Sequence, residues 1–257
     1  MMSELQVRFE NANKIVDEAA SLAKRLFAER SRMTVDEKST HDFASDADRQ
    51  VERFIRERLQ QVFPQDAILG EEMGGEVGDT FWAIDPIDGT TNFLRGLPLW
   101  GISLGYVENG LAMVGTIALP MLNLRVSAAL GCGAWCNGLP YRRQVLFPEV
   151  RLVGLGESQR WAASEIAMVD GSLRDEGWAV AKYRCATVGL SFAALGYTDG
   201  YIERYTSAWD IAAGAVICAE AGLTVRYHGD NRQGQMHIAA AIPAVQSIVE
   251  PFFRLRQ

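Results

Sequence analysis

The stretch Trp82-Ala83-Ile84-Asp85-Pro86-Ile87-Asp88-Gly89-Thr90-Thr91-Asn92-Phe93 organises this chain of 257 residues. An apolar run leads into it, and two carboxylates, Asp85 and Asp88, follow three positions apart. Pro86 between them fixes φ at about −65°, and Gly89 helps to close the turn. Two unpaired carboxylates this close repel each other, so we expect a cation between them. A hard divalent ion with oxygen ligands suits such a pair.

The same stretch also offers a place for an anion. Gly89-Thr90-Thr91 stands where a helix is expected to begin, and the free N–H groups of a helix start attract an anion such as phosphate. Taken alone, the pattern fits equally a surface turn whose aspartates only cap backbone groups.

Two further acidic stretches favour a site over a simple turn. Gly70-Glu71-Glu72 follows the apolar run Ala67-Ile68-Leu69, so two more acids stand at a strand end. Ala208-Trp209-Asp210-Ile211-Ala212-Ala213-Gly214 places an acid at the opening of a helix of small residues. Solubility alone does not explain acids at the ends of three apolar runs.

With these residues the chain resembles the inositol monophosphatase family, whose members are Mg²⁺-dependent, Li⁺-sensitive phosphomonoesterases. The matching motifs are residues 70–72, 85–93 and 209–214, and the resemblance extends over almost the whole chain, including residues 38–48 and 199–203. It implies an α+β fold with layers in the order α/β/α/β/α, and a homodimer.

The resemblance assigns roles to the matching positions. It implies two or three Mg²⁺ ions that hold a small phosphate monoester while an activated water attacks phosphorus. Asp48 is implied to hydrogen-bond Thr90, and this pair, with Glu72 nearby, would position and deprotonate the water. Lys38 would add positive charge above the site. The implied metal ligands are Glu71, Asp85, the Ile87 carbonyl, Asp88 and Asp210; the implied phosphate contacts are Gly89, Thr90 and Thr91; the implied substrate contacts are Asp88, Glu203, Arg184 and Ala186.

The substrate alcohol is less certain than the chemistry, because the chain departs from the family pattern at two places. Arg184 stands where many members have a small residue, and Arg95 stands where members active on inositol often have His. The sequence therefore predicts inositol monophosphate or a similar polyol phosphate, with histidinol phosphate as the alternative. Without the resemblance, the simpler interpretation of Glu203 is a surface acid at a strand end that pairs with Arg204 or Arg184.

Composition limits the partners. A net charge of −7 and a pI near 5.1 argue against a nucleic-acid surface, which needs a basic stripe. No apolar run is long enough to span a bilayer, and the start Met1-Met2-Ser3-Glu4 does not resemble a secretory signal, so we expect a cytoplasmic protein without membrane contact. The three histidines form no zinc-type pair, which favours a site of oxygen ligands.

The length fits one large domain or two small ones. The resemblance implies a single domain, residues 1–257, whose half from about 1 to 145 carries the main metal motif and whose half from about 146 to 257 carries the Trp-Asp motif and the substrate wall. Ser45 is the expected cap of the second helix, and Asp48 in its first turn suits the helix dipole even without a site. The predicted helices are residues 4–30, 46–62, 162–174, 187–195, 209–221 and 243–254; the predicted strands are 67–69, 80–84, 100–106, 112–119, 124–129, 133–136, 151–155, 179–183, 200–204, 223–227 and 237–241; residues 33–44 are predicted to be irregular.

A serine hydrolase is the rival from another chemical class. Gly101-Ile102-Ser103-Leu104-Gly105 matches the G-x-S-x-G pattern, and Asp210 with His228 or His237 follows in the order of such enzymes. That pattern needs a sharp turn from strand to helix at the serine. Here the strand alternation runs straight through Ser103, so we expect the serine to be structural.

Overall fold

The computed structural model describes residues 3–39, 42–230 and 235–253. Its helices are α1 (Glu4–Glu29), α2 (Asp46–Val62), α3 (Thr90–Arg95), α4 (Ala163–Asp175), α5 (Ala186–Leu195), α6 (Ala208–Glu220) and α7 (Pro243–Phe253). Its strands are β1 (Val35–Ser39), β2 (Asp42–Ser45), β3 (Ala67–Gly70), β4 (Thr80–Asp88), β5 (Gly101–Glu108), β6 (Leu111–Leu119), β7 (Leu124–Ala129), β8 (Ala134–Cys136), β9 (Leu139–Tyr141), β10 (Leu152–Leu155), β11 (Ala179–Ala181), β12 (Gly200–Thr206), β13 (Thr224–Asp230) and β14 (Gln235–Ala241).

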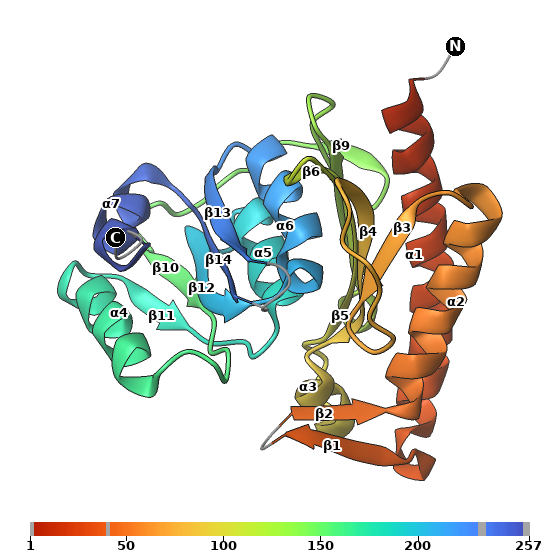
Figure 1. Ribbon diagram of the computed structural model, residues 1–257. Coiled ribbons are helices and arrows are strands. Elements are labelled where there is room, and N and C mark those ends of the chain that lie inside the picture. Colours follow the sequence, from red (N-terminus) through yellow and green to blue (C-terminus); the bar gives the residue numbers. More distant parts are fainter. Residues whose placement is uncertain (1–2, 40–41, 231–234, 254–257) are drawn as a thin grey trace.

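These elements stack in layers (Figure 1). Helices α1 and α2 form one outer layer beside a seven-stranded sheet. Helices α5 and α6 fill the middle, a five-stranded sheet follows, and α4 with α7 forms the other outer layer. The α+β fold with the layer order α/β/α/β/α is therefore confirmed.

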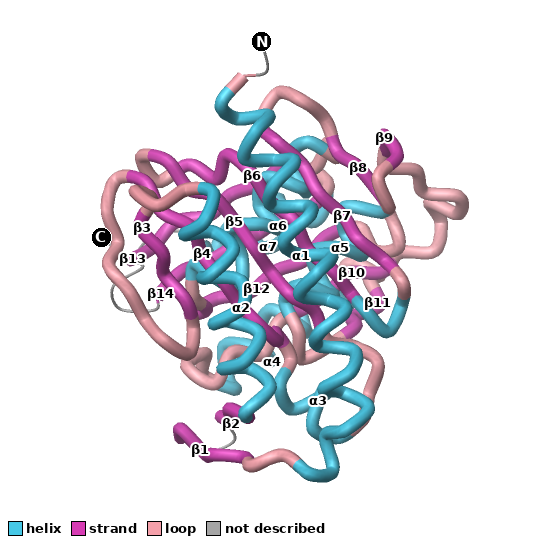
Figure 2. The backbone as a smooth tube through the Cα atoms, turned by 90° about the vertical axis from the view of Figure 1, so that its right-hand side faces the viewer, coloured by secondary structure: helices cyan, strands magenta, loops and turns pink. Residues whose placement is uncertain are grey.

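The two sheets differ in how their strands pair. The seven-stranded sheet runs β3-β4-β5-β6-β7-β8-β9, with β3 and β4 parallel and each later pair antiparallel. Helices α1 and α2 lie across one face of it (Figure 2), and their apolar sides bury a cluster with the strands beneath. The five-stranded sheet runs β11-β10-β12-β14-β13, with β10 parallel to both of its neighbours and the remaining pairs antiparallel.

Two glycines let helix α6 lie close against the seven-stranded sheet. A Cβ atom added to Gly115 would stand 2.3 Å from the carbonyl oxygen of Ala213, and one added to Gly105 would stand 2.8 Å from the Ala213 nitrogen. Contacts this short have no room for a side chain, so any larger residue would push the helix outward. Since Asp210 lies in the first turn of α6, this close approach places its carboxylate relative to the end of β4.

Helix α2 begins where the sequence predicts. The Ser45 hydroxyl accepts the Ala47 N–H at 3.2 Å, and the Asp48 carboxylate accepts the Ser45 N–H at 2.8 Å, which completes a capping box. The helix ends at Val62, shortly before Pro64, because a proline inside the helix would remove a hydrogen bond and clash with the preceding turn.

The segment 33–44 corrects the prediction of an irregular stretch. Strand β1 pairs antiparallel with β2, Val35 lying opposite Ser45, in a hairpin outside both large sheets. The segment is polar, so no alternation of apolar and polar residues revealed the strands. Lys38 lies in β1, but its side chain lies outside the described part, and its predicted charge above the site stays a prediction.

The other predicted elements are present with small shifts at their ends, the largest being that β4 continues through Asp88 instead of ending at Ile84. No helix in the described ranges is long and apolar enough to cross a membrane. The single domain with two halves remains a prediction.

Candidate active site

Three aspartates from two distant segments meet between the seven-stranded sheet and helix α6. Each of Asp85, Asp88 and Asp210 offers a carboxylate oxygen, and these atoms all lie within 4.8 Å of one another. Residues three apart in a regular strand point to opposite faces. The pairing of β4 with β5 is irregular between Asp85 and Asp88, where Pro86 stands, and this interruption allows both side chains to serve one site.

The cluster is electrostatically strained without a cation. Burial raises the pKa of Asp85 well above its usual range, and the charges of Glu71 and Asp88 raise it further. Burial and the Asp210 charge raise the pKa of Asp88 to about 6. Buried carboxylates that raise one another's pKa fit a hard divalent ion, because a cation replaces the missing water and offsets the repulsion. The all-oxygen donor set suits Mg²⁺ rather than zinc.

Asp210 is held by the start of its own helix. Its Oδ2 accepts the Ser207 N–H at 2.8 Å in a capping box, and it also accepts the Thr206 hydroxyl. The Arg160 guanidinium acts in the opposite direction to burial and lowers the pKa of Asp210, although burial dominates and the pKa is raised overall. Cap bonds of this kind fix the carboxylate in direction as well as in place.

The predicted hydrogen bond between Asp48 and Thr90 is present. Thr90 Oγ1 lies 3.2 Å from Asp48 Oδ1 and 3.1 Å from the Ile87 carbonyl oxygen. Asp48 is fully buried, and its other oxygen accepts the Ser45 N–H. Burial raises the pKa of Asp48 above its usual value, and the hydrogen bonds from Ser45 and Thr90 partly oppose this shift.

The turn that starts α3 requires glycine. Gly89 has a φ of +85°, and a Cβ there would lie 3.2 Å from the Leu99 carbonyl oxygen and 3.1 Å from Cys185 Cβ. Thr90 and Thr91 follow as the first helical residues. The predicted helix start, with its backbone N–H groups, is therefore present beside the acidic cluster.

The motif asparagine ties this turn to the substrate wall. Asn92 is buried, and its side-chain amide donates to the Leu99 carbonyl at 2.7 Å and to the Tyr183 carbonyl at 2.9 Å. Beyond Tyr183, the start of helix α5 meets the acids directly, since the Thr187 N–H donates to Asp88 Oδ2 at 2.5 Å. Ala186, the predicted substrate contact one residue earlier, lines the cavity over these acids, and its role toward a substrate stays a prediction.

A cavity of about 170 Å³ opens over Asp88 and Asp210. Glu203 in its wall is 7% exposed and accepts the Tyr201 hydroxyl at 2.8 Å, so it is not the exposed acid of the simpler interpretation. Burial, and then the Asp210 charge, raise the pKa of Glu203 to about 8. The lining residues are Asp88, Glu157, Ser158, Gln159, Arg160, Arg184, Cys185, Ala186, Glu203, Thr206 and Asp210.

Glu71 and Glu72 come from the turn that follows β3. The Glu71 charge contributes to the raised pKa of Asp85, so the two side chains act on each other, but Glu71 lies outside the tight group of three aspartates. The Glu72 N–H donates to Glu52 Oε2 at 2.7 Å. The ligand role of Glu71 and the water-positioning role of Glu72 remain predictions.

Sequence reasoning missed several side chains that build this site. Arg160 reaches it from the segment before α4, Thr206 from β12, Thr187 from the start of α5, and Glu52 from the middle of α2. One related signal was readable, because Ser207 stands three residues before Asp210 as in a capping box. The others depend on contacts between segments far apart in the chain.

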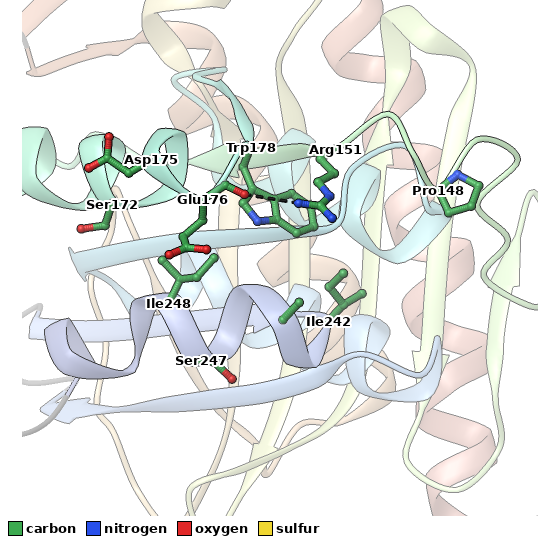
Figure 3. Close-up of a pocket in the computed structure, with 10 residues that line it drawn as sticks. Pro148, Arg151, Ser172, Asp175, Glu176, Trp178, Ile242, Ser247 and Ile248 are labelled. Carbon is green, nitrogen blue, oxygen red and sulfur yellow. Dashed lines mark hydrogen bonds between the residues drawn. The ribbon is translucent and has the colours of Figure 1, made fainter.

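Neither Ser103 nor the cavity between α4 and α7 is an alternative active site. Ser103 is fully buried in β5, and its hydroxyl donates to the Trp209 carbonyl at 2.9 Å, so it is structural as expected. A roomier cavity, about 820 Å³, lies elsewhere, between α4 and α7 (Figure 3). There Arg151 lies over the Trp178 ring and donates to the Glu176 carbonyl, and none of the predicted site residues lines it.

Comparison with known proteins agrees with this site. A model of the inositol monophosphatase family matches residues 4–249. The inositol-1-monophosphatase of Rhizobium meliloti is 33% identical over 213 residues, which cover 80% of this chain and 80% of that protein. The fructose-1,6-bisphosphatase/inositol-1-monophosphatase of Thermotoga maritima is 35% identical over 182 residues, 70% of each chain.

The same likeness holds in three dimensions. The crystal structure of extragenic suppressor protein suhB from Bartonella henselae superposes with a TM-score of 0.85 at 25% identity, covering 97% of this chain and 99% of that one. The family match extends over nearly the full sequence, and the fold agrees with it. This chain therefore belongs to the inositol monophosphatase family of phosphomonoester hydrolases.

Proposed function

We propose that this protein hydrolyses a small phosphate monoester with the help of Mg²⁺, and that the substrate is inositol monophosphate or a similar polyol phosphate. The observation that carries the proposal is the buried group Asp85, Asp88 and Asp210, whose oxygens lie within 4.8 Å of one another beside the turn at Gly89 and Thr90. A metal site and an anion site side by side are what phosphoryl transfer to water requires.

In this proposal the chain holds two or three Mg²⁺ ions through Asp85, Asp88 and Asp210, joined by Glu71 and the Ile87 carbonyl. Bound Mg²⁺ supplies positive charge against the phosphate and lowers the pKa of a water molecule. The N–H groups of residues 89–91 bind the phosphate oxygens and keep the phosphorus in line with the attacking water.

Asp48 and Thr90 are proposed to position the attacking water and to accept its proton. Thr90 has one hydroxyl proton, and when it is donated to Asp48 the hydroxyl oxygen is free to accept from water. The pKa of Asp48 is raised by burial, which suits a group that takes a proton during turnover. Glu72 is proposed to assist from the neighbouring turn.

The residues around the cavity favour a polyol phosphate over histidinol phosphate. Arg160 and Arg184 both line it, and two cationic residues in the lining disfavour a cationic amine and attract a phosphate anion, while the acids there are proposed to be neutralised by Mg²⁺. Arg184 is also held at a φ of +54°, which is uncommon for a residue with a side chain and is typical of functional sites. Glu203, with a pKa near 8 when no metal is bound, hydrogen-bonds hydroxyl groups in either protonation state.

Glu203→Gln separates these two substrates. With inositol phosphate, Gln keeps an acceptor oxygen, so we expect a cost of about 1 kcal/mol or less in kcat/KM. With histidinol phosphate, the lost charge faces an amine, and the cost would be roughly 2–4 kcal/mol. The measurement is kcat/KM for both substrates on wild type and variant, with exposed Glu176→Gln as the control. A wild-type preference for histidinol phosphate with a large selective loss in the variant would reject the polyol substrate.

Lithium sensitivity follows from the same carboxylates. Li⁺ is a small hard cation, so it can take one Mg²⁺ position after the alcohol has left and slow the release of phosphate. We expect uncompetitive inhibition by Li⁺ in the millimolar range, measured from initial rates at several substrate concentrations, with K⁺ at equal ionic strength as the control. Rates that stay the same with Li⁺ and K⁺ would contradict this prediction without touching the Mg²⁺ requirement.

The homodimer and the cytoplasmic location that the sequence predicts also belong to the proposal. One surface supports an association, since exposed apolar side chains gather along the segment after β9 and beside the end of α5. They are Leu146, Phe147, Val150 and Tyr197. Apolar surface of this kind is favourable to cover.

A further inference from the structure

The turn that carries Glu71 depends on a side chain from helix α2. Gly70 and Gly74 exchange two backbone hydrogen bonds at 2.9 and 3.1 Å and close the turn, and the Glu71 N–H donates to the Ile84 carbonyl of β4 at 3.2 Å. This leaves the N–H groups of residues 72 and 73 pointing away from the strands. Two such donors at a partly buried turn need acceptors from another segment or from water.

Glu52 supplies both acceptors. Its Oε2 accepts the Glu72 N–H at 2.7 Å, and its Oε1 accepts the Met73 N–H at 3.1 Å. The Glu52 side chain is fully buried, and Arg56, one helical turn later, donates to the same Oε1 at 2.7 Å. Arg56 also donates to the Gly74 carbonyl. The Glu52 carboxylate thus binds the N–H groups of residues 72 and 73, and the Arg56 guanidinium binds the carbonyl group at the end of the turn.

Gly70 makes room for this arrangement. A Cβ at that position would lie 2.1 Å from Glu52 Oε1 and 2.8 Å from an Arg56 nitrogen. The first residue of the Gly-Glu-Glu motif is therefore a glycine because the buried pair occupies the space of its side chain. The same helix places Asp48 against Thr90 one turn before Glu52, so one face of α2 contacts both sides of the site.

We propose that Glu52, assisted by Arg56, is a positioning residue for Mg²⁺ binding, because it holds residues 70–74 so that the Glu71 carboxylate faces Asp85. The proposal rests on the proposed function, since it concerns the same metal site. Before a cation binds, the like charges of Glu71 and Asp85 push the turn away from the strand end. Charge-assisted hydrogen bonds from a buried carboxylate resist that movement, and the ligand is then in place before the ion arrives.

Glu52→Gln keeps the size of the side chain but replaces one acceptor oxygen with an NH₂ group that faces donors. We expect the dissociation constant for Mg²⁺, measured by titration calorimetry on the protein without substrate, to rise about 10- to 100-fold. We expect kcat at saturating Mg²⁺ to return to within a few-fold of wild type. Exposed Glu57→Gln, on the same helix, is the matched control and should leave both quantities unchanged.

A double-variant cycle tests whether Glu52 acts through Glu71. In a Glu71→Gln background, Glu52→Gln should add little to the loss of Mg²⁺ affinity, because the ligand it positions is already removed. An unchanged Mg²⁺ affinity in Glu52→Gln, or a full additional loss in the Glu71→Gln background, would overturn the proposal. A lower melting temperature with unchanged Mg²⁺ affinity would show that Glu52 is structural only.

Two further results keep the inference separate from the proposed function. If Glu52→Gln does not fold, Arg56→Gln takes its place. It keeps the carboxylate and should raise the Mg²⁺ dissociation constant by a smaller factor, whereas an unchanged constant would refute the role of the pair. If the wild-type protein itself binds no Mg²⁺, the proposed function fails. If the wild type binds Mg²⁺ and the variants bind it equally well, only the positioning role fails.

Discussion

Replacing Asp210 with Asn is expected to lower kcat by at least about 100-fold while the fold stays intact. The reason is that a proposed metal ligand loses its charge, and mutating even the residues that hydrogen-bond metal ligands lowers affinity or activity about 10- to 100-fold. Asn still accepts the Ser207 N–H, so the start of α6 keeps its cap. The measurement is phosphate release against Mg²⁺ concentration, with circular dichroism to follow the fold.

The thermal stability of Asp210→Asn tests separately whether the Asp210 carboxylate needs a cation in the folded protein. The pKa of Asp210 is raised by burial, which means that its ionised form is unfavourable in the folded protein without a cation. We therefore expect Asp210→Asn in EDTA to melt at or above the wild-type temperature. Asp175→Asn, at the far end of α4, is the control. Near-normal turnover of Asp210→Asn at low Mg²⁺ would mean that Asp210 is only a helix cap.

Removing Mg²⁺ by chelation is expected to lower the activity at least as much as Asp210→Asn does. Activity on a generic phosphomonoester should fall about 1,000-fold or more in EDTA and return with Mg²⁺, because a metal ion contributes several kcal/mol to charge stabilisation in the transition state. Ser103→Ala should keep the activity, and a serine-directed phosphonate should not inhibit it, since the Ser103 hydroxyl is buried against the Trp209 carbonyl. Full activity in EDTA, or inhibition by the phosphonate alone, would return the serine hydrolase to consideration.

The pH dependence of the metal-free protein checks the electrostatics behind this expectation. The pKa is raised to about 6 for Asp88 and to about 8 for Glu203. A carboxyl whose folded pKa is raised stabilises the fold at low pH and loses that contribution as pH rises through the folded value. The melting temperature in EDTA should therefore fall between about pH 4, the ordinary range of a carboxyl, and about pH 8, the raised value of Glu203. Added Mg²⁺ should raise the melting temperature more at the higher pH, because the ion offsets the negative charge of the ionised carboxylates.

Much of the candidate site was readable from the sequence because its signals are local. Asp85 and Asp88 stand around Pro86 in one short stretch, and the acids at Glu71 and Asp210 follow apolar runs. Helix starts are also local, so Ser45 was predicted as the cap of α2 from its neighbours alone. The family resemblance then supplied the bond between Asp48 and Thr90, and the structure confirmed it.

The hairpin of β1 and β2 shows where local signals fail. Its residues are mostly polar, and it joins neither large sheet, so no hydrophobic periodicity marked it. The burial of Glu203 is also invisible to local signals. A lone acid at the end of a strand looks exposed in the sequence, and only the contact with Tyr201 and the wall of the cavity bury it.

By itself, the sequence determined the chemistry of the donors: carboxylates around a proline and glycine turn, two capped helices, and no zinc-type histidine pair. The tertiary structure decided which of those groups meet. Asp210 reaches Asp85 because Gly105 and Gly115 admit helix α6 to the sheet, and Glu52 reaches residues 70–74 because Gly70 leaves it room. Local patterns follow from neighbouring residues, whereas these contacts depend on how closely two distant segments can approach, which is set by packing.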